Sequence, residues 1–445
     1  MRRSAFYYVA AAASAAAAAA SSAPTFNLVD FGGKGDGVAD NTAAFAAAVA
    51  AVAAAGGGTL VVPAAAAGAG AATYKTRAFN LTSSMVLFVE RGATIQASLD
   101  FPQWPLVAPL RAYPGDGPRY APLIGGYGLR DVRITGNASA GAGAQAEVDG
   151  LGLAWDVAYA AKLLKGQRPH AIEFARSSGI EIDRVAIIEA AYWTLHFSEC
   201  SDVHVHDATI VSATENGDGV DVGAQDVLLE RVYISTADDA IAIKSGDAPA
   251  GSGLPPSRNV TIRDSTLASG EACVAIGSEM TAGVQDVFVQ NITCEAAGHA
   301  LLYIKERQDA GGFVRNVRVV DSVISGPVER FLWVSQHFGE GGENAGPAAA
   351  LPVLSNVSLA NIAVGASGLV VEPALLNGAR APPGVGGAGA ILGIDLENVD
   401  LGTTLMPWSC ANASGTYRNV KPTPCSDLTP ASQNESDDAL RDAAR

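Results

Sequence analysis

One short phrase recurs through most of this chain and limits what it can fold into. It is a small or polar pair, then an apolar residue, any residue and a second apolar residue, with further apolar positions shortly afterwards. Examples are LRDVRITG, SSGIEIDRVAII, CSDVHVHDATIV, AQDVLLERVYIS, SRNVTIRDSTLA, VQDVFVQNITCE, VRNVRVVDSVIS, LSNVSLANIAVG and LGIDLENVDLG. The first apolar residues of consecutive phrases are Ile180, Val203, Val227, Val260, Val287, Val317, Val357 and Ile394. Alternation with period two predicts short strands, and self-similarity at this spacing predicts a solenoid.

The composition of the repeat decides between a helical and a β solenoid. Helical repeats need apolar residues at i, i+3 and i+4, and the phrases lack them. They are rich in Val and Ile, which favours a parallel β-helix whose coils each add two or three short strands. A second family of runs, WTLHF, GVDV, AIAIKS, CVAIGS, LLYIKE and FLWVSQ, is predicted to form neighbouring strands of one sheet. We therefore predict an all-β parallel β-helix, with equivalent residues of adjacent coils about 4.8 Å apart.

A different kind of segment precedes the repeat. A Gly-rich turn is followed by a helix-like stretch, residues 41–55, and then by a strand. Because the terminal repeats of a solenoid need a cover, we predict that this helix caps the N-terminal end. The Gly-x-Gly there matches neither a phosphate loop nor a dinucleotide fingerprint. The glycine-rich residues 377–390 are predicted to be a surface loop.

The two ends of the chain indicate a processed protein with one folded domain. Residues 1–23 contain two arginines, an uncharged Ala-rich stretch and then small residues, which is the order of a secretory signal peptide. An organellar transit peptide is the alternative. Residues 24–425 are predicted to form a single parallel β-helix domain, and residues 426–445 a polar, disordered tail. Secretion is also favoured by glycosylation sequons at Asn80, Asn137, Asn259, Asn291, Asn356, Asn412 and Asn434.

The overall charge excludes several kinds of partner. The formal net charge is −16 and the isoelectric point is near 4.8, which argues against a nucleic-acid binder and against anionic membrane surfaces. No stretch after the leader is long and apolar enough to span a bilayer, so we expect a soluble mature protein. Hydrophobic residues make up 49% of the chain, which is ample material for a core. We expect a monomer.

The five cysteines are too few for a disulfide scaffold. Their odd number leaves at least one thiol unpaired within the chain. Cys410 and Cys425 flank a short segment that contains Gly and Pro, and we predict that they are bridged. None of the five has metal-ligand spacing.

An acidic doublet is the first candidate for chemistry. The stretch STADDAIAIKSG, residues 235–246, places Asp238 and Asp239 directly before an alternating apolar run. Taken alone, an Asp pair before a strand is usually a cap or a turn, because Asp hydrogen-bonds nearby backbone. In the stacked register, however, Asp218 lies one coil from the doublet, CVAIGS lies on the next coil and Lys305 lies beyond it. Three carboxylates are therefore predicted to gather on one face with a cation nearby.

These motifs resemble the family 28 glycoside hydrolases, the polygalacturonase-like enzymes of pectin breakdown. The resemblance runs through VDFGGKGDGVADNTAAF, PLIGGYG, RPHAIEF, YWTLHF, NGDGVDV, STADDAIAIKSG, VAIGSEMTAGV and YIKERQDAGGFVRNV. It implies a right-handed parallel β-helix that hydrolyses a glycosidic bond of a polysaccharide with inversion, and without a metal or organic cofactor. The family pattern Asn-Thr-Asp falls on Asn216, Gly217 and Asp218, so that Gly stands here in place of the Thr. By the same carry-over Asp238 is the general acid, and Asp218 with Asp239 activates water.

The chemistry of inversion agrees with such a cluster. Inverting hydrolysis needs one protonated carboxylic acid on the leaving oxygen and a carboxylate that deprotonates water on the opposite face. Like charges placed close together raise at least one pKa, which keeps a proton available near neutral or mildly acidic pH.

Two departures from the family pattern concern the substrate. The usual histidine falls on Glu271 or Ala272 in SGEACVAIGSE, and the usual Arg-x-Lys is here Tyr303 to Lys305. In the family that arginine and lysine grip a uronate carboxylate, and Tyr cannot imitate the planar fork of Arg. The candidate substrate-binding residues are Lys305, Asn216, Tyr303, His299, His196 and Glu271.

His299 is a candidate replacement for the missing histidine. Setting Ile304 over Ile276 in the stacked sheet places His299 over Glu271, one coil from it. We hypothesise that the pair restores the hydrogen bond that orients the general acid Asp238. The alternative is that His299 only ends a strand in a turn.

Three functions remain open from the sequence. The first is a secreted glycosidase that acts on a pectic or related acidic polysaccharide. The second is a polysaccharide lyase or epimerase, because a fold does not fix its chemistry, although the NGD and DD spacing favours hydrolysis. The third is a catalytically inactive carbohydrate-binding wall protein, since the family His and Arg are replaced.

Overall fold

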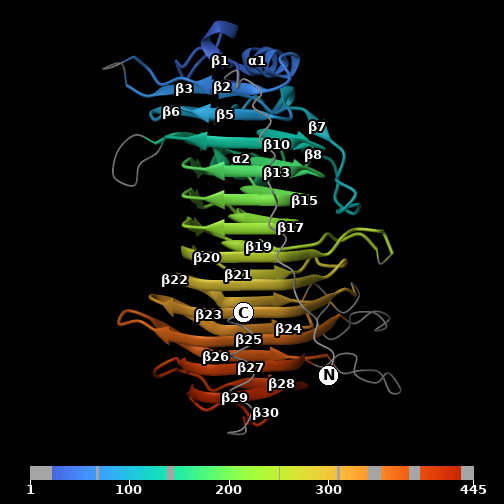
Figure 1. Cartoon of the computed structure of the whole chain (residues 1–445), viewed down its shortest axis with the longest axis vertical. Helices are drawn as coiled ribbons and strands as arrows, with labels where there is room; N and C mark the ends of the chain where they lie inside the picture. Colours follow the sequence, from blue (N-terminus) through green and yellow to red (C-terminus); the bar gives the residue numbers. More distant parts are fainter. Residues whose placement is uncertain are drawn as a thin grey trace, which may run out of the picture.

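The computed structural model describes residues 23–66, 70–137, 145–249, 251–307, 311–338, 352–379 and 391–431. The chain winds into a column of stacked coils, with α1 (Thr42–Ala54) at one end (Figure 1). Strands of successive coils pair in parallel and join into one 28-stranded sheet, and among the described residues β7 and β8 form a separate antiparallel pair. The predicted all-β parallel β-helix is confirmed. The proposed leader, most of the predicted tail and residues 380–390 of the glycine-rich region lie outside the described residues.

The described residues form two α-helices, two short 3-10 helices and 30 strands. The helices are α1 and α2 (Gly152–Ala160), with 3-10 turns at Leu28–Phe31 and Phe101–Gln103. The strands up to the site are β1 (Thr25–Asn27), β2 (Gly58–Val62), β3 (Ala72–Thr76), β4 (Phe79–Asn80), β5 (Met85–Val89), β6 (Ala93–Ala97), β7 (Leu106–Val107), β8 (Arg119–Tyr120), β9 (Ile124–Tyr127), β10 (Arg130–Gly136), β11 (Glu147–Asp149), β12 (Ile172–Ala175), β13 (Ser178–Asp183), β14 (Ala186–Ile188), β15 (Leu195–His206) and β16 (Thr209–Ser212). The remaining strands are β17 (Val220–Glu230), β18 (Tyr233–Thr236), β19 (Ile241–Ile243), β20 (Ser257–Ser269), β21 (Ala272–Gly277), β22 (Val284–Lys305), β23 (Phe313–Ile324), β24 (Pro327–Ser335), β25 (Val353–Val364), β26 (Leu369–Asn377), β27 (Ile391–Asp400), β28 (Ser409–Ala411), β29 (Ala413–Lys421) and β30 (Leu428–Pro430).

The first apolar residues of the repeated phrase stack directly on one another. Val203 pairs in register with Val227, Val227 with Val260, Val260 with Val287, and Val287 with Val317. All five are buried. Because burying a Val side chain stabilises a fold by roughly 1.5–3 kcal/mol, every coil adds to the column through the contact with its neighbours.

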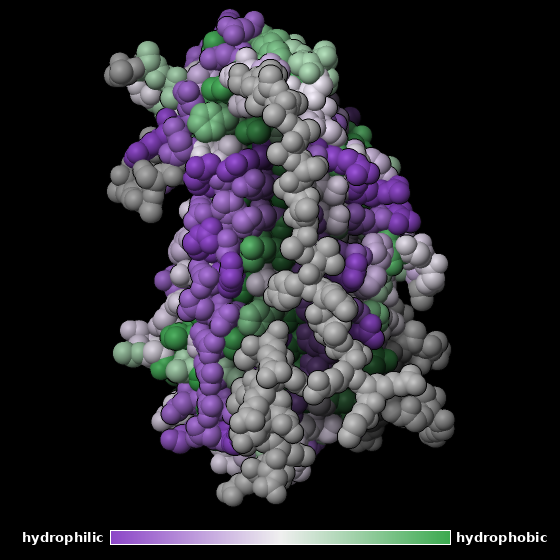
Figure 2. All heavy atoms as spheres, viewed as in Figure 1, coloured by the Kyte–Doolittle hydropathy of each residue, from purple (hydrophilic) through white to green (hydrophobic). Residues whose placement is uncertain are grey.

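Asn and Asp occupy left-handed bends inside the long strands. Asp226, Asn259, Asp286 and Asn316 all have φ near +55°, in the left-handed region that Asn and Asp tolerate better than most residues. Their side chains also form a ladder, in which Asn259 Nδ2 donates to Asp226 at 2.7 Å and Asn316 Nδ2 to Asp286 at 2.8 Å. Hydrophilic residues accordingly form a band along the column (Figure 2). The Asn of the sequon at Asn259 therefore has a structural reason, since it occupies one of these bends.

The N-terminal helix covers the first coils, as the sequence predicts. Phe45 of α1 is fully buried and stacks on Phe79 with the ring centroids 4.3 Å apart. Asn41 ties the start of the helix to its surroundings, since its Oδ1 accepts from the Lys34 amide at 2.7 Å and its Nδ2 donates to the Lys75 carbonyl at 3.1 Å. Within the described parts of the chain, no helix has the length and apolarity needed to cross a bilayer.

Four of the cysteines form disulfides. The predicted bridge between Cys410 and Cys425 is confirmed. A second bridge joins Cys273 to Cys294, which the sequence analysis did not predict. Cys200 is the unpaired thiol, and burial raises its pKa to about 12. It is therefore an inert core residue rather than a nucleophile.

Candidate active site

The three predicted carboxylates meet at the starts of two adjacent strands. Asp218 precedes β17 and the doublet precedes β19; the two strands pair in register, and the Gly219 amide donates to the Asp239 carbonyl at 2.9 Å. One oxygen each of Asp218, Asp238 and Asp239 lie within 4.8 Å of one another. Asp218 is 3% exposed and Asp239 1% exposed, whereas Asp238 is only half-buried. Asp238 is thus the acid of the three most open to a substrate.

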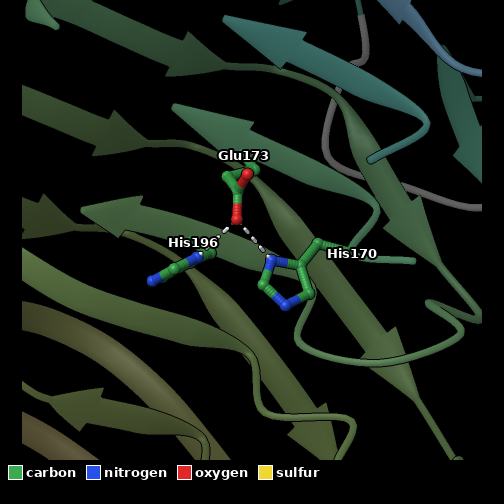
Figure 3. A group of neighbouring side chains, drawn as sticks. All are labelled: His170, Glu173 and His196. Carbon is green, nitrogen blue, oxygen red and sulfur yellow. Dashed lines mark hydrogen bonds and ion pairs between the residues drawn. The ribbon is translucent and has the colours of Figure 1, made fainter. Parts of the chain in front are cut away.

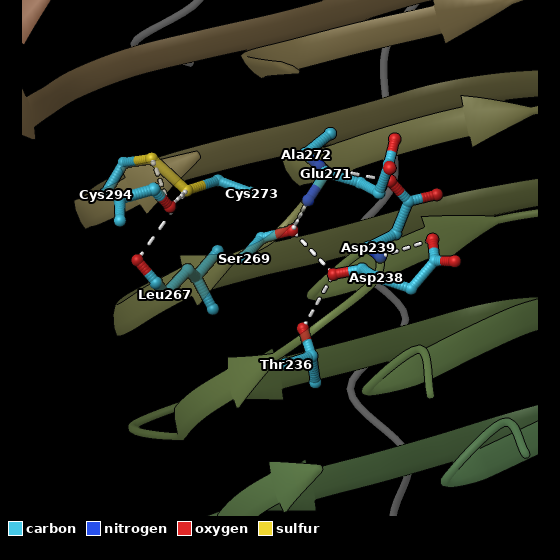
Figure 4. The surroundings of a disulfide bond; sticks show 10 residues. Thr236, Asp238, Asp239, Leu267, Ser269, Glu271, Ala272, Cys273 and Cys294 are labelled. Carbon is cyan, nitrogen blue, oxygen red and sulfur yellow. Dashed lines mark hydrogen bonds between the residues drawn. A yellow bond between two sulfur atoms is a disulfide. The ribbon is translucent and has the colours of Figure 1, made fainter. Parts of the chain in front are cut away.

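Hydrogen bonds hold both the backbone carbonyl and the carboxyl group of Asp238. Its carbonyl accepts from the hydroxyls of Thr236 at 2.8 Å and Ser269 at 2.6 Å (Figure 4). Its carboxyl oxygens accept from the Asp239 amide at 2.8 Å and from Asn216 Nδ2 at 3.3 Å. The first two contacts fix the backbone of Asp238 and the last two orient its carboxyl group. Asn216 lies at the site, as predicted.

Asp239 is anchored as a charged group. Its Oδ2 lies 2.6 Å from Lys305 Nζ, and its Oδ1 accepts from the Ala272 amide at 3.2 Å. Burial raises the pKa of Asp239, although the charge of Lys305 opposes that shift. Lys305, predicted as a substrate clamp, is therefore also the counter-ion of a predicted catalytic carboxylate.

A second buried lysine lies on the other side of the acids. Lys244 Nζ lies 3.6 Å from Asp218, 3.2 Å from Asp221 and 3.1 Å from Glu279. Burial disfavours its charge, but the carboxylates of Glu279, Asp221 and Asp218 raise the pKa of Lys244 well above its usual value. Burial also raises the pKa of Asp221 to about 7, against the effect of Lys244. Burial, followed by repulsion from Asp221, raises the pKa of Asp218 well above its ordinary range.

Asp221, Lys244 and Glu279 are not among the residues predicted from the sequence. A signal for Asp221 was present, because it alternates with the buried Val220 and Val222 and must face the same side as the site. Charged residues between two core residues of a strand are uncommon unless they are paired. Glu279 follows a strand in a turn, so its distance from Lys244 depends on the tertiary structure.

Three groups of side chains have the donors for a cation. They are the three aspartates, His170 with Glu173 and His196, and Glu181 with His204 and His206. At the aspartates, Lys305 and Lys244 already supply two positive charges within 4 Å, so an additional divalent ion would meet repulsion. Both histidines of the second group already contact Glu173.

His299 lies where the register argument places it. Its amide donates to the Glu271 carbonyl at 2.7 Å, and the two side chains form an ion pair. Accordingly, the hydrogen bond that the His299 ring donates to Glu271 raises the pKa of His299. Tyr303 stacks on Trp333 with the ring centroids 4.3 Å apart, and the His299 ring packs edge-on against Trp333 at 5.3 Å. Among the described contacts none joins His299 to the side chain of Asp238.

His196 is in the predicted sheet but is fully buried. Its Nδ1 lies 2.8 Å from Glu173, which also contacts His170 Nδ1 at 2.9 Å (Figure 3). It borders a cavity together with Trp193 and Tyr113 rather than lying beside the three acids.

Gly217, between Asn216 and Asp218, is required by close packing. A Cβ built on it would lie 2.5 Å from Thr214 Oγ1 and 2.7 Å from Ser212 Oγ. The Thr214 carbonyl oxygen would also lie 2.8 Å away, so a side chain at position 217 would require the backbone to shift. Gly217 therefore lets the chain pass close to Thr214 directly before Asp218.

Clustered carboxyl groups with shifted pKa values are typical of the acid and base groups of glycoside-cleaving enzymes, and this is the class that the site indicates. The chain belongs to glycosyl hydrolases family 28, whose family model matches residues 127–415. It is a polygalacturonase-like O-glycosyl hydrolase.

Relatives and solved structures agree with this assignment. A "Probable polygalacturonase" of Vitis vinifera is 31% identical over 420 residues, which cover 91% of this chain and 81% of the relative. The fold is similar to that of the exopolygalacturonase of Thermotoga maritima, with a TM-score of 0.68 and 22% identity over 92% of each chain. It is also similar to the family 28 exopolygalacturonase of Yersinia enterocolitica, with a TM-score of 0.70 and 18% identity over 91% of this chain and 78% of the other.

Proposed function

We propose that this enzyme is secreted and hydrolyses a pectic or related acidic polysaccharide by an inverting acid/base mechanism. The observation that carries the proposal is the meeting of Asp218, Asp238 and Asp239, whose oxygens lie within 4.8 Å of one another. Asp238 is the general acid, because it is the most accessible of the three and two donors hold its carboxyl group. Asp218 and Asp239 together hold and deprotonate the attacking water.

The role of the water-activating pair follows from its surroundings. A base must be ionised, and Lys305 stabilises the charged form of Asp239 in a site where burial opposes it. Asp218 has the opposite tendency, since burial and Asp221 favour its protonated form. The pair can therefore hold one proton between them and accept a second from water during the reaction.

The short spacing of the acids bears on the stereochemistry. Inverting glycosidases usually separate their carboxyl groups by about 6.5–9.5 Å and retaining ones by about 5–5.5 Å. A retaining reaction, however, needs a carboxylate that is free to bond to the sugar. Both oxygens of Asp239 are occupied, one by Lys305 and one by the Ala272 amide. We therefore favour inversion, with the water held by the Asp218 and Asp239 pair.

Product analysis tests the reaction type. Incubation with homogalacturonan oligosaccharides should release new reducing ends without ultraviolet absorbance, because hydrolysis leaves no double bond in the ring. Proton NMR during the first minutes should show the anomer opposite to that of the cleaved linkage. The retained anomer would contradict the assigned roles of Asp218 and Asp239. Unsaturated products would identify a lyase, and binding without turnover would identify an inactive wall protein.

An acidic substrate is supported by the cations on one side of the acids. Lys305 is buried next to Asp239, and the ion pair with Glu271 keeps His299 charged at mildly acidic pH. Trp333, which stacks on the buried Tyr303 and is itself only partly buried, adjoins them and is proposed to contact a sugar ring. These groups are proposed to bind the uronate residue on the side of the acids toward the C-terminal coils.

His299 is further proposed to position the general acid through Glu271. The Glu271 amide donates to Ser269 Oγ at 2.9 Å, and Ser269 in turn donates to the Asp238 carbonyl at 2.6 Å (Figure 4). We expect His299→Gln to lower kcat about tenfold to a hundredfold, the scale of a small displacement at a reacting centre. In the wild type kcat should also fall as the pH rises through the pKa of His299, because the ion pair with Glu271 is then lost. This decrease of kcat with pH should be absent in His299→Gln.

The matched variant Glu271→Gln tests the same link from the other side. It should reproduce the loss, and the double variant should lose no more than either single one, because both changes remove one interaction. An increase in KM alone, with an unchanged kcat and pH profile, would show that His299 only binds substrate.

Location outside the cell, or in the cell wall, is proposed on three grounds. The leader has the order of a signal peptide, the two disulfides suit an oxidising compartment, and pectic substrates are extracellular polymers. Import into an organelle by a transit peptide is the alternative.

A further inference from the structure

A cavity lies one coil away from the acids, toward the N-terminal end. It has a volume of about 110 Å³, several times the roughly 10–15 Å³ that one water needs. Its lining comes from β8 and the loop before it, from the segment before β12, and from β15 and the segment before it: Leu110, Tyr113, Asp116, Gly117, Arg119, Gln167, His170, Tyr192, Trp193 and His196. The Thr194 amide, next to Trp193, donates to the Asp218 carbonyl at 2.8 Å. The cavity is thus adjacent to the acids, at about the spacing of neighbouring coils.

Lys244 connects the cavity to the acids physically. Its Nζ lies 3.9 Å from the ring centroid of Trp193 and 3.6 Å from Asp218. A sugar unit bound in the cavity would therefore be adjacent, in the polysaccharide chain, to the sugar unit bound at the three acids.

His196 lines this cavity and carries a buried nitrogen without a hydrogen-bond partner in the part of the chain that the structure describes. The side chain is 1% exposed, and its Nε2 has no hydrogen-bond partner among the described residues. The other nitrogen, Nδ1, lies 2.8 Å from Glu173 Oε2, and in Figure 3 it points at that carboxylate while Nε2 points away. Burial would raise the pKa of Glu173, but the hydrogen bonds from His170 and His196 hold it well below its usual value.

The tautomer follows from this arrangement. An ionised Glu173 only accepts, so Nδ1 of His196 must carry a proton and donate it. Burial lowers the pKa of His196 and keeps the ring neutral. Nε2 is therefore a bare lone pair that needs a donor, and a buried acceptor without one costs about 1–3 kcal/mol.

The charges around the cavity disfavour an anion. Arg119 is already paired with Glu173 at 2.5 Å, and Lys244 faces three carboxylates. Asp116 adds a further carboxyl group to the wall. A uronate carboxylate there would face the carboxyl group of Asp116 and the bare Nε2 of His196, and both disfavour an anion. A hydroxyl group would instead satisfy His196, beside Trp193 and Tyr113, which line the same cavity.

We propose that this cavity binds a neutral, hydroxyl-bearing sugar residue beside the scissile bond, and that Nε2 of His196 selects it by accepting a hydrogen bond from a hydroxyl group. The inference rests on the proposed function and adds to it a specificity at the neighbouring residue. The substrate would then carry a uronate on the side of Lys305 and a neutral sugar on the side of His196.

Binding to the inactive Asp238→Asn enzyme tests this directly. The probes are trigalacturonate and two trimers in which one terminal carboxylate, at either end, is reduced to the alcohol. Calorimetry should show one reduced trimer binding about tenfold more tightly than trigalacturonate, the scale of one satisfied hydrogen bond. Adding His196→Asn should remove most of this gain, because the Asn amide can still donate to Glu173 but leaves no acceptor at the Nε2 position.

The control is His204→Asn, the same exchange at a histidine that pairs with Glu230 outside the site, and it should keep the gain. Tightest binding of trigalacturonate, or a gain that survives His196→Asn, would overturn the inference. If the His196 variant does not fold, the enzyme with His196 unchanged is tested with reduced trimers that each lack one hydroxyl group of the reduced sugar. Loss of one particular hydroxyl should erase the tenfold gain in affinity. Equal affinity for all of these deoxy trimers would overturn the inference.

The outcome in which no trimer binds would count against the acidic polysaccharide, not against the cavity. Its preference would then be measured with methyl galactoside and methyl galacturonate, which need no other subsite. Tighter binding of the galactoside supports the inference, and equal or tighter binding of the galacturonate overturns it.

Discussion

Asp238→Asn should lower kcat by about a thousandfold or more, because general acid catalysis contributes roughly 10²–10⁴ in rate and an amide cannot protonate a leaving oxygen. The fold and substrate binding should be retained, since Asn keeps an oxygen for the Asp239 amide that now donates at 2.8 Å. Initial rates on oligogalacturonates, with circular dichroism for the fold and calorimetry for binding, measure the result.

A substrate with an acidic leaving group separates a general acid from a structural residue. A nitrophenyl glycoside needs little protonation, so Asp238→Asn should lose much less activity on it than on an oligosaccharide. Asp218→Asn removes a water-activating group and should lose activity on both substrates. Asp226→Asn, in a left-handed bend where Asn is equally suited, should leave activity unchanged. Equal losses of Asp238→Asn on both substrates would remove it from the role of acid.

Lys244→Met should be the most destabilising single change at the site. The lysine neutralises Asp218, Asp221 and Glu279 in a buried setting, and removing one partner of a buried ion pair costs about 3–5 kcal/mol. We expect the free energy of unfolding at pH 8 to fall by about this amount, measured by denaturant titration with tryptophan fluorescence.

The loss should shrink at acidic pH. A carboxyl group whose pKa is raised by folding, as burial raises that of Asp221 to about 7, stabilises the fold below its unfolded pKa and loses this as the pH rises. Without Lys244 the pKa values of Asp221 and Asp218 would rise further, so the stability of the variant should decline more steeply than that of the wild type between about pH 4 and pH 8. Lys421→Met, at an exposed lysine 4.0 Å from Asp400, should change stability by less than about 1 kcal/mol. Equal pH dependence in wild type and Lys244→Met would contradict the role of this lysine.

Much of the site could be predicted because a β-helix converts sequence spacing into position. Once Ile304 is placed over Ile276, the register of the two strands places Tyr303 over Ala275. Both pairs are in register in the structure. The same rule brought Asp218 to the doublet and His299 to Glu271. Turn residues followed local conformation as well, since left-handed turns favour Asn and Asp wherever they occur.

Side-chain partners could not be predicted in this way. His196 has the strand position of a residue on the site face, yet it is buried, because Tyr113 from the loop before β8 packs edge-on against its ring with the centroids 5.4 Å apart. The length and path of that loop do not follow from the repeat. The bridge between Cys273 and Cys294 was missed for a related reason: β21 and β22 are adjacent, but which side chains meet across a coil depends on how each turn is wound.

The sequence by itself determined the coil, the stacking register, the capping helix and the three acids, because these depend on the alternation of apolar residues and on local turn conformation. The tertiary structure alone decided the charge balance of the site and its neighbouring cavity. Lys244, Asp221 and Glu279 form one network because burial makes an unpaired charge costly and draws together groups from three separate segments. The lone pair on His196 is likewise set by Glu173 and Arg119, which come from other segments of the chain.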